Sequence, residues 1–530
     1  MSIYFSEFLV PKFQLGNGFD ACVQIRKRNF SHFLLEFPLV YMKIFTTLCI
    51  IKIFEVQMSF LIRRYYFIFI FAYGLITGAS FWNSPQLLAS NATARQFKDG
   101  DRVCFIGDSI THGGSYHEVI YLYYLTRFPH RKFEIVNCGV SGDSAKGTVS
   151  RFDWDIAKHH PTICTIMLGM NDVGRDQYGK EKSDPTWDEK RMKTLDFYKN
   201  KMLELDKMIQ NLGSELIFIS PSIYDQTADL KETNYFGVND ALGQCANFVT
   251  EQSKILNRGL VDFHGPMTKL NLEIQAADPK KTLVGNDRVH PGRDGHFVMA
   301  YQFLMSQACP SIVSFIELQS GKNKALKQDN CTVSDVAWSN SGVQFTVDPQ
   351  ALPMPMMPGT DVARKLVNFN RDLNQEILKI SGLIDGKYQV IINGNVLHTF
   401  NSESLAEGCN LADLTSSPQY QQALTVMHLN SKRHQLAQDL RVISLWKHWT
   451  LIKDKVNIGD VEAVKKSIDA HLERNKAFAW HGYMDSQAKK FFEVYPKEAS
   501  LINDMKLLNN ELYLLNIPQK LLVEIKKIKT

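Results

Sequence analysis

A serine follows an apolar run shortly after residue 100. The run Val103 to Ile106 stops at Gly107, and Asp108 and Ser109 come next. A serine presented at the end of a buried strand can act as a nucleophile, provided that a base and donors for an oxyanion lie nearby. The same residues could also form an ordinary Asp-Ser turn, so the other partners have to be found.

A possible base and its partner lie much later, in the stretch GNDRVHPGRDGH at residues 285–296. Asp287 and His290 are three residues apart, just ahead of a helix expected to begin near Gly292. In a tight turn this spacing places both side chains on one side, so the carboxylate can accept from one imidazole nitrogen while the other faces Ser109. A lone D-x-x-H is more often a turn-capping aspartate beside a surface histidine.

Candidate donors for an oxyanion occur at two further points. In NCGVSGD, residues 137–143, Gly142 could bring a backbone N–H close to a ligand. In LGMND, residues 168–172, Asn171 offers an uncharged side-chain N–H. With the N–H of Ser109 they would supply three donors, and removing one such donor typically costs about 10²–10³ in rate. A plain glycine turn and a capping asparagine are the alternatives.

The elements that must position these residues alternate between strand and helix. Short apolar runs, typical of buried parallel strands, occupy residues 102–106, 133–137, 162–168, 215–220 and 259–263. Helical patterns occupy residues 115–128, 145–159, 188–212, 238–257 and 292–308. This order predicts an α/β fold with a parallel sheet covered on both faces, in which sites form beyond the carboxyl ends of the strands.

Four short blocks, all within about residues 98–310, together resemble the SGNH (GDSL-type) hydrolase family. The blocks are Gly107-Asp108-Ser109, Ser141-Gly142-Asp143, Gly169-Met170-Asn171-Asp172 and Asp287-Arg288-Val289-His290. The resemblance implies a flavodoxin-like three-layer α/β/α domain with a five-stranded parallel sheet. It also implies ester hydrolysis that needs no metal or cofactor. The motif G-x-S-x-G is absent around Ser109, so the chain lacks the nucleophile elbow of the α/β-hydrolases.

The resemblance also assigns roles to individual residues. It makes Ser109 the nucleophile, His290 the base and Asp287 the partner of that base. Gly142 and Asn171 complete the oxyanion hole with Ser109. Asp108 is expected to fix the loop rather than to take part in the chemistry.

The substrate is suggested by a narrower resemblance to secreted bacterial members that sit among polysaccharide-degrading enzymes. Its segments are residues 235–248, 262–271, 287–300 and 417–430. It implies a small O-acyl group, such as acetyl, on a carbohydrate, and no long apolar lid for a larger acyl chain is evident. A lipase, lysophospholipase or thioesterase of the same family is the alternative. Arg288, Arg293 and Tyr178 could contact substrate, but the sequence favours solvated surface residues at all three positions.

Two other classes of function stay open. Asp108, Asp172, His112 and His290 could hold a divalent metal for phosphoester cleavage, although the Asn, Gly and Ser blocks would then have no role. The second class is a secreted binding protein on a hydrolase scaffold. The intact set of Ser109, Asp287 and His290 argues against it. The net charge of +5, with no dense Lys/Arg run, argues against nucleic acid as a partner.

The N-terminal part has the order of a secretory signal peptide. A basic segment from Met58 is followed by an apolar run over residues 65–79 and by Ala92-Thr93-Ala94, an A-x-A site. We therefore expect residues 58–94 to be cleaved and the protein to be secreted or periplasmic. An uncleaved membrane anchor at residues 65–82 is the alternative. Residues 1–57 are predicted to be a mis-assigned or disordered extension.

The rest of the chain divides into three parts by its pattern of apolar residues and turn signals. Residues 95–310 form the expected hydrolase domain, 311–410 a β-rich segment with hairpin signals at Asp385-Gly386 and Asn393-Gly394, and 411–530 a helical region. Ser417-Pro418 is a helix start, and helical pattern continues from Val461 to the end. No catalytic constellation is evident after residue 310. The nine cysteines include no CxxC pair; Cys309 and Cys331 either pair in an oxidising compartment or are reduced and buried.

Overall fold

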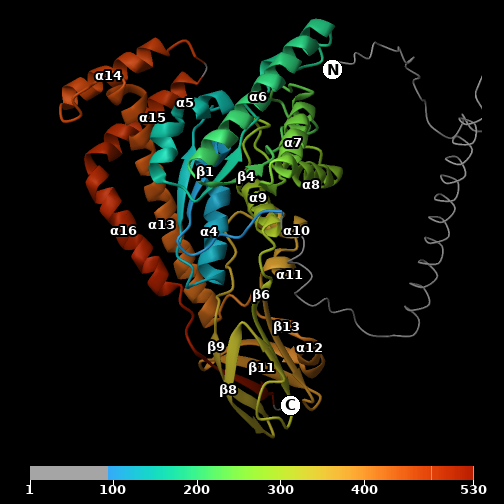
Figure 1. Ribbon diagram of the computed structural model, residues 1–530. Coiled ribbons are helices and arrows are strands. Elements are labelled where there is room, and N and C mark those ends of the chain that lie inside the picture. The colour runs from blue at the N-terminus through green and yellow to red at the C-terminus, as the bar shows by residue number, and fades with distance from the viewer. Residues whose placement is uncertain (1–92, 479, 529–530) are drawn as a thin grey trace, which may run out of the picture. The chain divides into compact units, whose positions relative to one another are not determined.

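Residues 93–478 and 480–528 are described by the computed structural model (Figure 1). Residues 1–57 and almost all of 58–94 lie outside this range, so the extension and the signal peptide stay predictions. Among the helices of the described residues, none combines the length and the apolar character that a membrane crossing needs.

A five-stranded parallel sheet carries the first half of the described chain, in the strand order β2-β1-β3-β4-β5. Its strands are β1 (Arg102–Gly107), β2 (Glu134–Gly139), β3 (Ile163–Met167), β4 (Glu215–Ile219) and β5 (Gly259–Val261). Neighbouring strands all pair in parallel. The predicted fold class is therefore confirmed, and each predicted apolar run overlaps one strand, although β1 and β2 extend past the ends of their runs.

Helices cover both faces of this sheet, because alternate side chains of each strand point to opposite sides. Val103 and Phe105 of β1 belong to one core, with α4 (Ser115–Arg127), α8 (His264–Ala277) and α9 (Arg293–Ser306). Cys104 and Ile106 belong to the other, with the remaining sheet helices. Those helices are α5 (Ala145–Asp155), α6 (Pro185–Asn211) and α7 (Val238–Ile255). This is the predicted three-layer arrangement; α8 is an additional helix that the sequence pattern did not predict.

Two antiparallel-rich sheets follow and share one apolar core. The first has the order β13-β10-β6-β7 and the second β12-β11-β14-β9-β8. The first contains β6 (Ile312–Gln319), β7 (Lys327–Asp329), β10 (Gln375–Ser381) and β13 (Cys409–Asn410). The second contains β8 (Cys331–Ser339), β9 (Gly342–Pro349), β11 (Lys387–Ile392), β12 (Asn395–Asn401) and β14 (Leu521–Lys527). Short helices interrupt them at α10 (Asp361–Leu366), α11 (Phe369–Leu373) and α12 (Ser402–Glu407).

One of the two hairpin predictions is wrong. Asn393-Gly394 does join the antiparallel strands β11 and β12. Asp385-Gly386, in contrast, lies between β10 and β11, which belong to different sheets. The two residues form a connection across the core because β10 pairs with β6 and β13 instead of with the strand that follows it.

The last part of the chain is helical until its final strand. It contains α13 (Pro418–Trp446), a π-helical turn (Lys447–Ile452), α14 (Val461–Arg474), α15 (His481–Val494) and α16 (Glu498–Leu515). The predicted start of α13 is confirmed, since the Ser417 side chain accepts from Tyr420 N. Helix does not continue to the end as predicted, because β14 lies between β11 and β9.

Cys309 and Cys331 are not joined to each other, and both are buried. The Cys309 thiol faces the Tyr124 hydroxyl, whereas the Cys331 thiol faces the carbonyl of Phe315. The reduced and buried alternative therefore describes this structure.

Candidate active site

The first catalytic candidate lies at the carboxyl end of β1. Ser109 is the first residue of the short helix α3 (Ser109–Gly113), and the Asp108 side chain caps it by accepting from Ile110 N at 3.0 Å. Burial raises the pKa of Asp108 to about 6, against the effects of this hydrogen bond and of His290, which lower it. Asp108 therefore fixes the loop, as expected from the sequence.

Ser109, His290 and Asp287 form a continuous chain of hydrogen bonds. Ser109 Oγ lies 2.7 Å from His290 Nε2, and His290 Nδ1 lies 2.5 Å from Asp287 Oδ2. The second carboxylate oxygen accepts from the backbone N–H groups of Val289 and His290, each at 3.0 Å. The D-x-x-H spacing therefore brings the two side chains together in one turn.

The charge state of Asp287 follows from these contacts. Partial burial alone would raise the pKa of its carboxyl, but hydrogen bonds from the His290 side chain and from two backbone N–H groups hold it well below its usual range. The carboxylate is thus ionised at neutral pH and orients the imidazole. About half of each side chain, 51% for His290 and 52% for Asp287, is exposed, so a substrate can reach the site directly.

The three expected oxyanion donors lie on loops that follow adjacent strands. Gly142, after β2, has a φ of 78°, in the left-handed region that favours glycine. Asn171, after β3, donates one amide hydrogen to Asp143 O at 2.9 Å, which leaves the second for a ligand. No described residue accepts from the backbone N–H of Ser109 or Gly142. Because β2, β1 and β3 are neighbours, the sheet brings these loops together.

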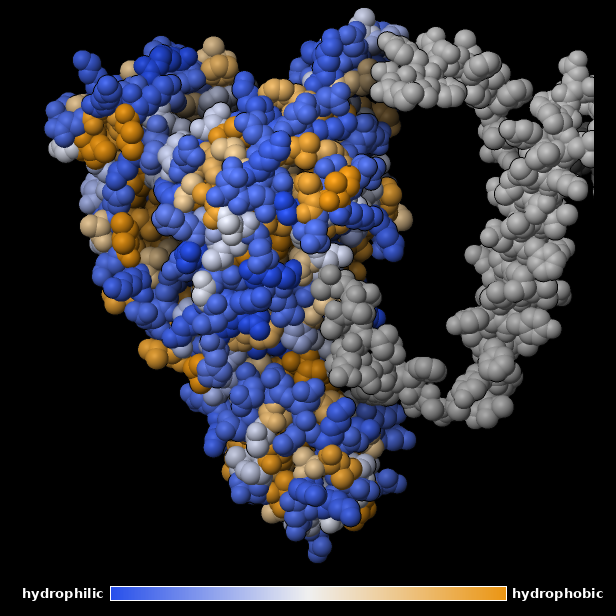
Figure 2. All heavy atoms as spheres, viewed as in Figure 1, coloured by the Kyte–Doolittle hydropathy of each residue, from blue (hydrophilic) through white to orange (hydrophobic). Residues whose placement is uncertain are grey.

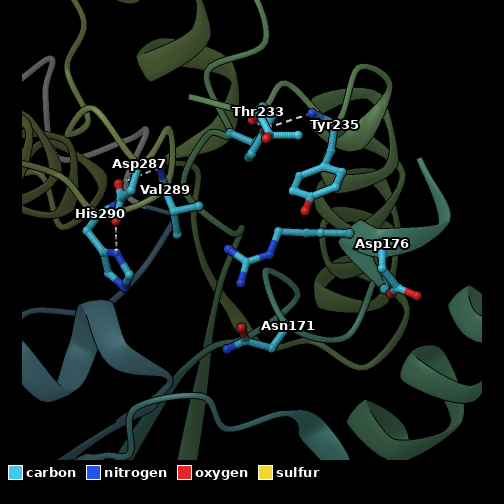
Figure 3. Close-up of a pocket in the computed structure, with 10 residues that line it drawn as sticks. Asn171, Asp176, Thr233, Tyr235, Asp287, Val289 and His290 are labelled. Carbon is cyan, nitrogen blue, oxygen red and sulfur yellow. Dashed lines mark hydrogen bonds and ion pairs between the residues drawn. The ribbon is translucent and has the colours of Figure 1, made fainter. Parts of the chain in front are cut away.

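A cavity of about 520 Å³ opens beside His290 (Figure 3). It is lined by Asn171, Gly174, Arg175, Asp176, Tyr224, Thr233, Tyr235, Asp287, Val289 and His290. His290 and Asp287 lie at one side of it, and the Tyr235 hydroxyl is directed into it from the other. The sequence analysis did not predict a role for Arg175 or Tyr235. The one feature that could have indicated Arg175 is its position shortly after Asn171 in the same loop.

The three side chains considered as substrate contacts have structural roles. Arg288 is buried and donates to the carbonyls of Asp225, Ala228, Leu230 and Glu232. Arg293 donates to the carbonyl of Pro358, and Tyr178 is buried. The interpretation as solvated surface residues is wrong for Arg288 and Tyr178. Backbone carbonyls hold the Arg288 guanidinium, and the Tyr178 ring belongs to an apolar core of the sheet, where it lies under the Arg191 guanidinium.

The four side chains of the metal alternative do not form a common cluster. Within residues 93–478 and 480–528, no group of three or more His, Cys, Asp and Glu side chains is arranged to hold a metal. Asp172 accepts from Ala145 N, and burial raises the pKa of Asp172 to about 7. His112 Nδ1 accepts from Ser141 N, while burial and two arginines lower the pKa of His112 to about 3. Both therefore hold the loops around the site.

The chain is similar to known proteins in sequence and in fold. The sequence model of the GDSL-like lipase/acylhydrolase family matches residues 105–297. A gut microbial diltiazem-metabolizing enzyme of known structure is 31% identical, covers 83% of this chain and 100% of its own, and superimposes with a TM-score of 0.74. The chain belongs to the GDSL-like lipase/acylhydrolase family. A curated relative, the acetylxylan esterase of Geobacillus stearothermophilus, is 26% identical over 226 residues, 39% of this chain and 93% of that protein.

This GDSL-like acylhydrolase is therefore an enzyme that hydrolyses carboxylic esters, and its site has a component from outside the matched region. Helix α13 carries Gln438, which donates to His112 O at 2.7 Å, and Arg441, which donates to Gly139 O at 3.0 Å. From α15, the Tyr483 hydroxyl lies 2.9 Å from Ser141 Oγ. These contacts could not be predicted from the sequence, because they join residues more than 300 positions apart.

Proposed function

We propose that this protein is a serine esterase that removes a small acyl group, such as acetyl, from a carbohydrate. Ser109 is the nucleophile, His290 the general base and Asp287 the residue that orients it. The N–H groups of Ser109 and Gly142 and the amide of Asn171 form the oxyanion hole. The observation that carries the proposal is the hydrogen-bonded chain of Ser109, His290 and Asp287.

In the first step, His290 Nε2 takes the proton of Ser109 as Oγ attacks the ester carbonyl carbon. The carbonyl oxygen becomes an oxyanion that the three donors stabilise. The ionised Asp287 stabilises the imidazolium through Nδ1. His290 then returns its proton to the leaving alcohol, and the acyl group remains on Ser109.

In the second step, water replaces the alcohol. His290 takes a proton from the water, whose oxygen attacks the acyl-enzyme, and the same oxyanion hole holds the second tetrahedral intermediate. Collapse of this intermediate releases the carboxylic acid and returns the proton to Ser109. No step requires a second acid or base, and this agrees with the local structural roles of Asp108 and Asp172.

The proposed substrate is supported by the site and by one relative. The half-exposed triad and a cavity lined by Tyr, Thr, Asn, Asp and Arg side chains suit a polar alcohol better than a long acyl chain. The acetylxylan esterase is a relative whose name describes an acetyl ester of a carbohydrate. A lipase or thioesterase would need a long apolar groove, which the lining residues of this cavity do not form.

The first test is the hydrolysis of p-nitrophenyl acetate by the wild type and by Ser109→Ala, with and without EDTA. We expect turnover that survives EDTA and falls by about 10⁴-fold or more in the variant. Equal rates in both proteins would remove Ser109 as the nucleophile. Loss of activity with EDTA alone would favour the metal-dependent alternative.

A second test addresses the substrate. The rates with p-nitrophenyl acetate, butyrate and octanoate should fall with chain length, and acetylated xylan should release acetate. Diltiazem also carries an acetyl ester, so it is a useful small-molecule comparison, given the similarity to the diltiazem-metabolizing enzyme. A preference for octanoate would favour a lipase instead.

We also propose that the protein is exported and that its leader is removed just upstream of Thr93. The signal pattern of residues 58–94 supports export. Thr93 and Ala94 both donate to Ser306 O, and Leu260 N donates to Thr93 O, so cleavage after Ala94 would remove bonded residues. Mass spectrometry of the mature protein tests this; an uncleaved chain in the membrane fraction would indicate the anchor at residues 65–82.

A further inference from the structure

The cavity beside His290 contains a guanidinium without a partner. Arg175 lines the cavity, yet its side chain makes no hydrogen bond and no ion pair within the described residues. Neighbouring arginines differ: Arg151 pairs with Asp143, Arg191 with Asp188, and Arg288 bonds to carbonyls. A partly exposed arginine without a protein partner beside the candidate catalytic residues has all of its N–H donors free for an anionic ligand.

The backbone turn that carries Arg175 is anchored to the rest of the protein. Arg175 opens the 3-10 turn Arg175–Gln177, after Gly174 in the left-handed region. Gln177 is buried, its amide bonds to Thr194, and its carbonyl accepts from Arg191 at 2.8 Å. Because the turn is anchored at Gln177, the binding of a ligand by Arg175 would not require the backbone of the turn to reorganise.

A second free donor faces the same space. The Tyr235 hydroxyl is directed into the cavity and has no partner among the described residues (Figure 3). Tyr224, the other tyrosine of the lining, is already used, since its hydroxyl donates to Thr233 O and accepts from Tyr235 N. Arg175 and Tyr235 are thus two unused donors that line the same cavity.

The charges around the cavity favour an anion. Asp287 is engaged by His290, and the carboxylate of Asp176 points away from the cavity (Figure 3). A guanidinium presents five N–H donors and no acceptor, in a planar fork that matches the two oxygens of a carboxylate, and the phenol adds one more donor.

We propose that Arg175 and Tyr235 form a subsite for the carboxylate of an acidic sugar, so that the substrate is an O-acyl ester of a uronic acid. This inference rests on the proposed function, because it places the sugar of the ester in the cavity beside His290. Arg175 binds the carboxylate through two parallel hydrogen bonds, and Tyr235 donates a third.

The first experiment measures binding, which does not depend on turnover. Methyl galacturonoside and methyl galactoside differ only in a carboxylate in place of a hydroxymethyl group. In the Ser109→Ala variant we expect the uronide to bind about 10- to 100-fold more tightly, and Arg175→Gln added to this variant should abolish the difference. Equal affinities for the two sugars, or a preference that survives Arg175→Gln, would overturn the subsite.

The second experiment measures kcat/KM for the mono-O-acetyl esters of the same two glycosides. The uronide preference should fall in Arg175→Gln, fall less in Arg175→Lys, which keeps the charge but loses the fork, and fall several-fold in Tyr235→Phe. The matched control is Arg474→Gln, which changes an exposed arginine on α14 and should leave the uronide preference unchanged. Failure of the proposed function is separate: it appears as the absence of Ser109-dependent p-nitrophenyl acetate hydrolysis, whatever the binding result.

Discussion

Glu376 is a fully buried carboxyl whose protonation should stabilise the fold. It lies on β10, and its Oε1 accepts from Gln419 Nε2 of α13 at 2.7 Å. Glu376 Oε2 and Gln419 Oε1 are both buried without a hydrogen-bond partner. One proton on Glu376 would let the acid and the amide bond to each other twice. Burial raises the pKa of Glu376 to about 7, against smaller opposing effects of Gln419 and Arg127.

The stability of the wild type should therefore fall as pH rises from about 4.5 to about 7, since only the unfolded state releases this proton there. Glu376→Gln forms the paired amides without titration. We expect it to be more stable than the wild type at pH 8, by up to about 3 kcal/mol, with a much smaller difference at pH 5. Urea unfolding at both pH values measures this. Exposed Glu403→Gln is the control; an equal effect of Glu376→Gln at both pH values would contradict the prediction.

At the scale of residues, the hydrogen-bonded arrangement of Ser109, His290 and Asp287 was predictable, but the cavity was not. Ser109 ends an apolar run, and Asp287 and His290 share one turn, so their relation is local in the sequence. Arg175 and Tyr235 lie in loops after different strands, and nothing in their spacing says that both face one space. Their role depends on which partners they lack, which only the folded chain shows.

Among the elements, α13 supports the loops of the site from outside the hydrolase sheet. The Arg441 guanidinium donates to Gly139 O, at the end of β2, and pairs with Asp155 of α5. Arg151 also pairs with Asp155, and all three side chains are buried. Burial would raise the pKa of Asp155, but the two arginines lower it to about 2. Asp155 therefore stays ionised, and both of its ion pairs persist, down to acid pH.

Arg441→Ala should destabilise the protein and slow the reaction. Its loss leaves a buried carboxylate with one partner and a carbonyl without its donor, for which a cost of about 3–5 kcal/mol is typical. Because Gly139 leads into the loop of Gly142, kcat for p-nitrophenyl acetate should fall more than KM rises. Urea unfolding and steady-state kinetics measure the two effects. Unchanged kcat in a destabilised variant would show that α13 only holds the fold together.

Elements in the hydrolase sheet were predictable because their patterns are local. The sequence of helix α4, SYHEVIYLYYLTR, has apolar residues around most of the helix, which predicts that a second element covers the side away from the sheet. In the structure, twelve of its thirteen residues are buried. Strand β14 was missed although Leu521, Val523 and Ile525 alternate on its buried side. Its partners β9 and β11 lie more than a hundred residues earlier, so the sequence around it shows only the helices that precede it.

In the molecule as a whole, the hydrolase region and the later helices share one core. Ala423, Val426, Met427 and Leu429 of α13 and Leu512 of α16 belong to the same buried cluster as α4 and α9. The face visible in Figure 2 is mainly hydrophilic, with hydrophobic residues in scattered patches. The acetylxylan esterase aligns over 226 residues, 93% of its length, so that relative has little chain equivalent to α13.

Residues 93–310 alone should therefore fold poorly in this protein, although they hold all of the proposed catalytic residues. Removal of α13 would expose apolar side chains of α4 and take away the donors to His112 O and Gly139 O. We expect low solubility, a lower urea midpoint than that of residues 93–528, and little esterase activity. Circular dichroism and p-nitrophenyl acetate assays on both forms test this. Equal midpoints and rates would show that the sheet region is independent.

The position of β14 also affects the order in which the chain can fold during synthesis. The strands of the parallel sheet all lie within residues 102–261, so they are complete early in synthesis. The second antiparallel sheet cannot, because its central strand is residues 521–527, and until these emerge β9 and β11 each have an unpaired edge. For more than a hundred residues of translation, those two edges are open to pairing with another chain. A chaperone would be needed most in that interval.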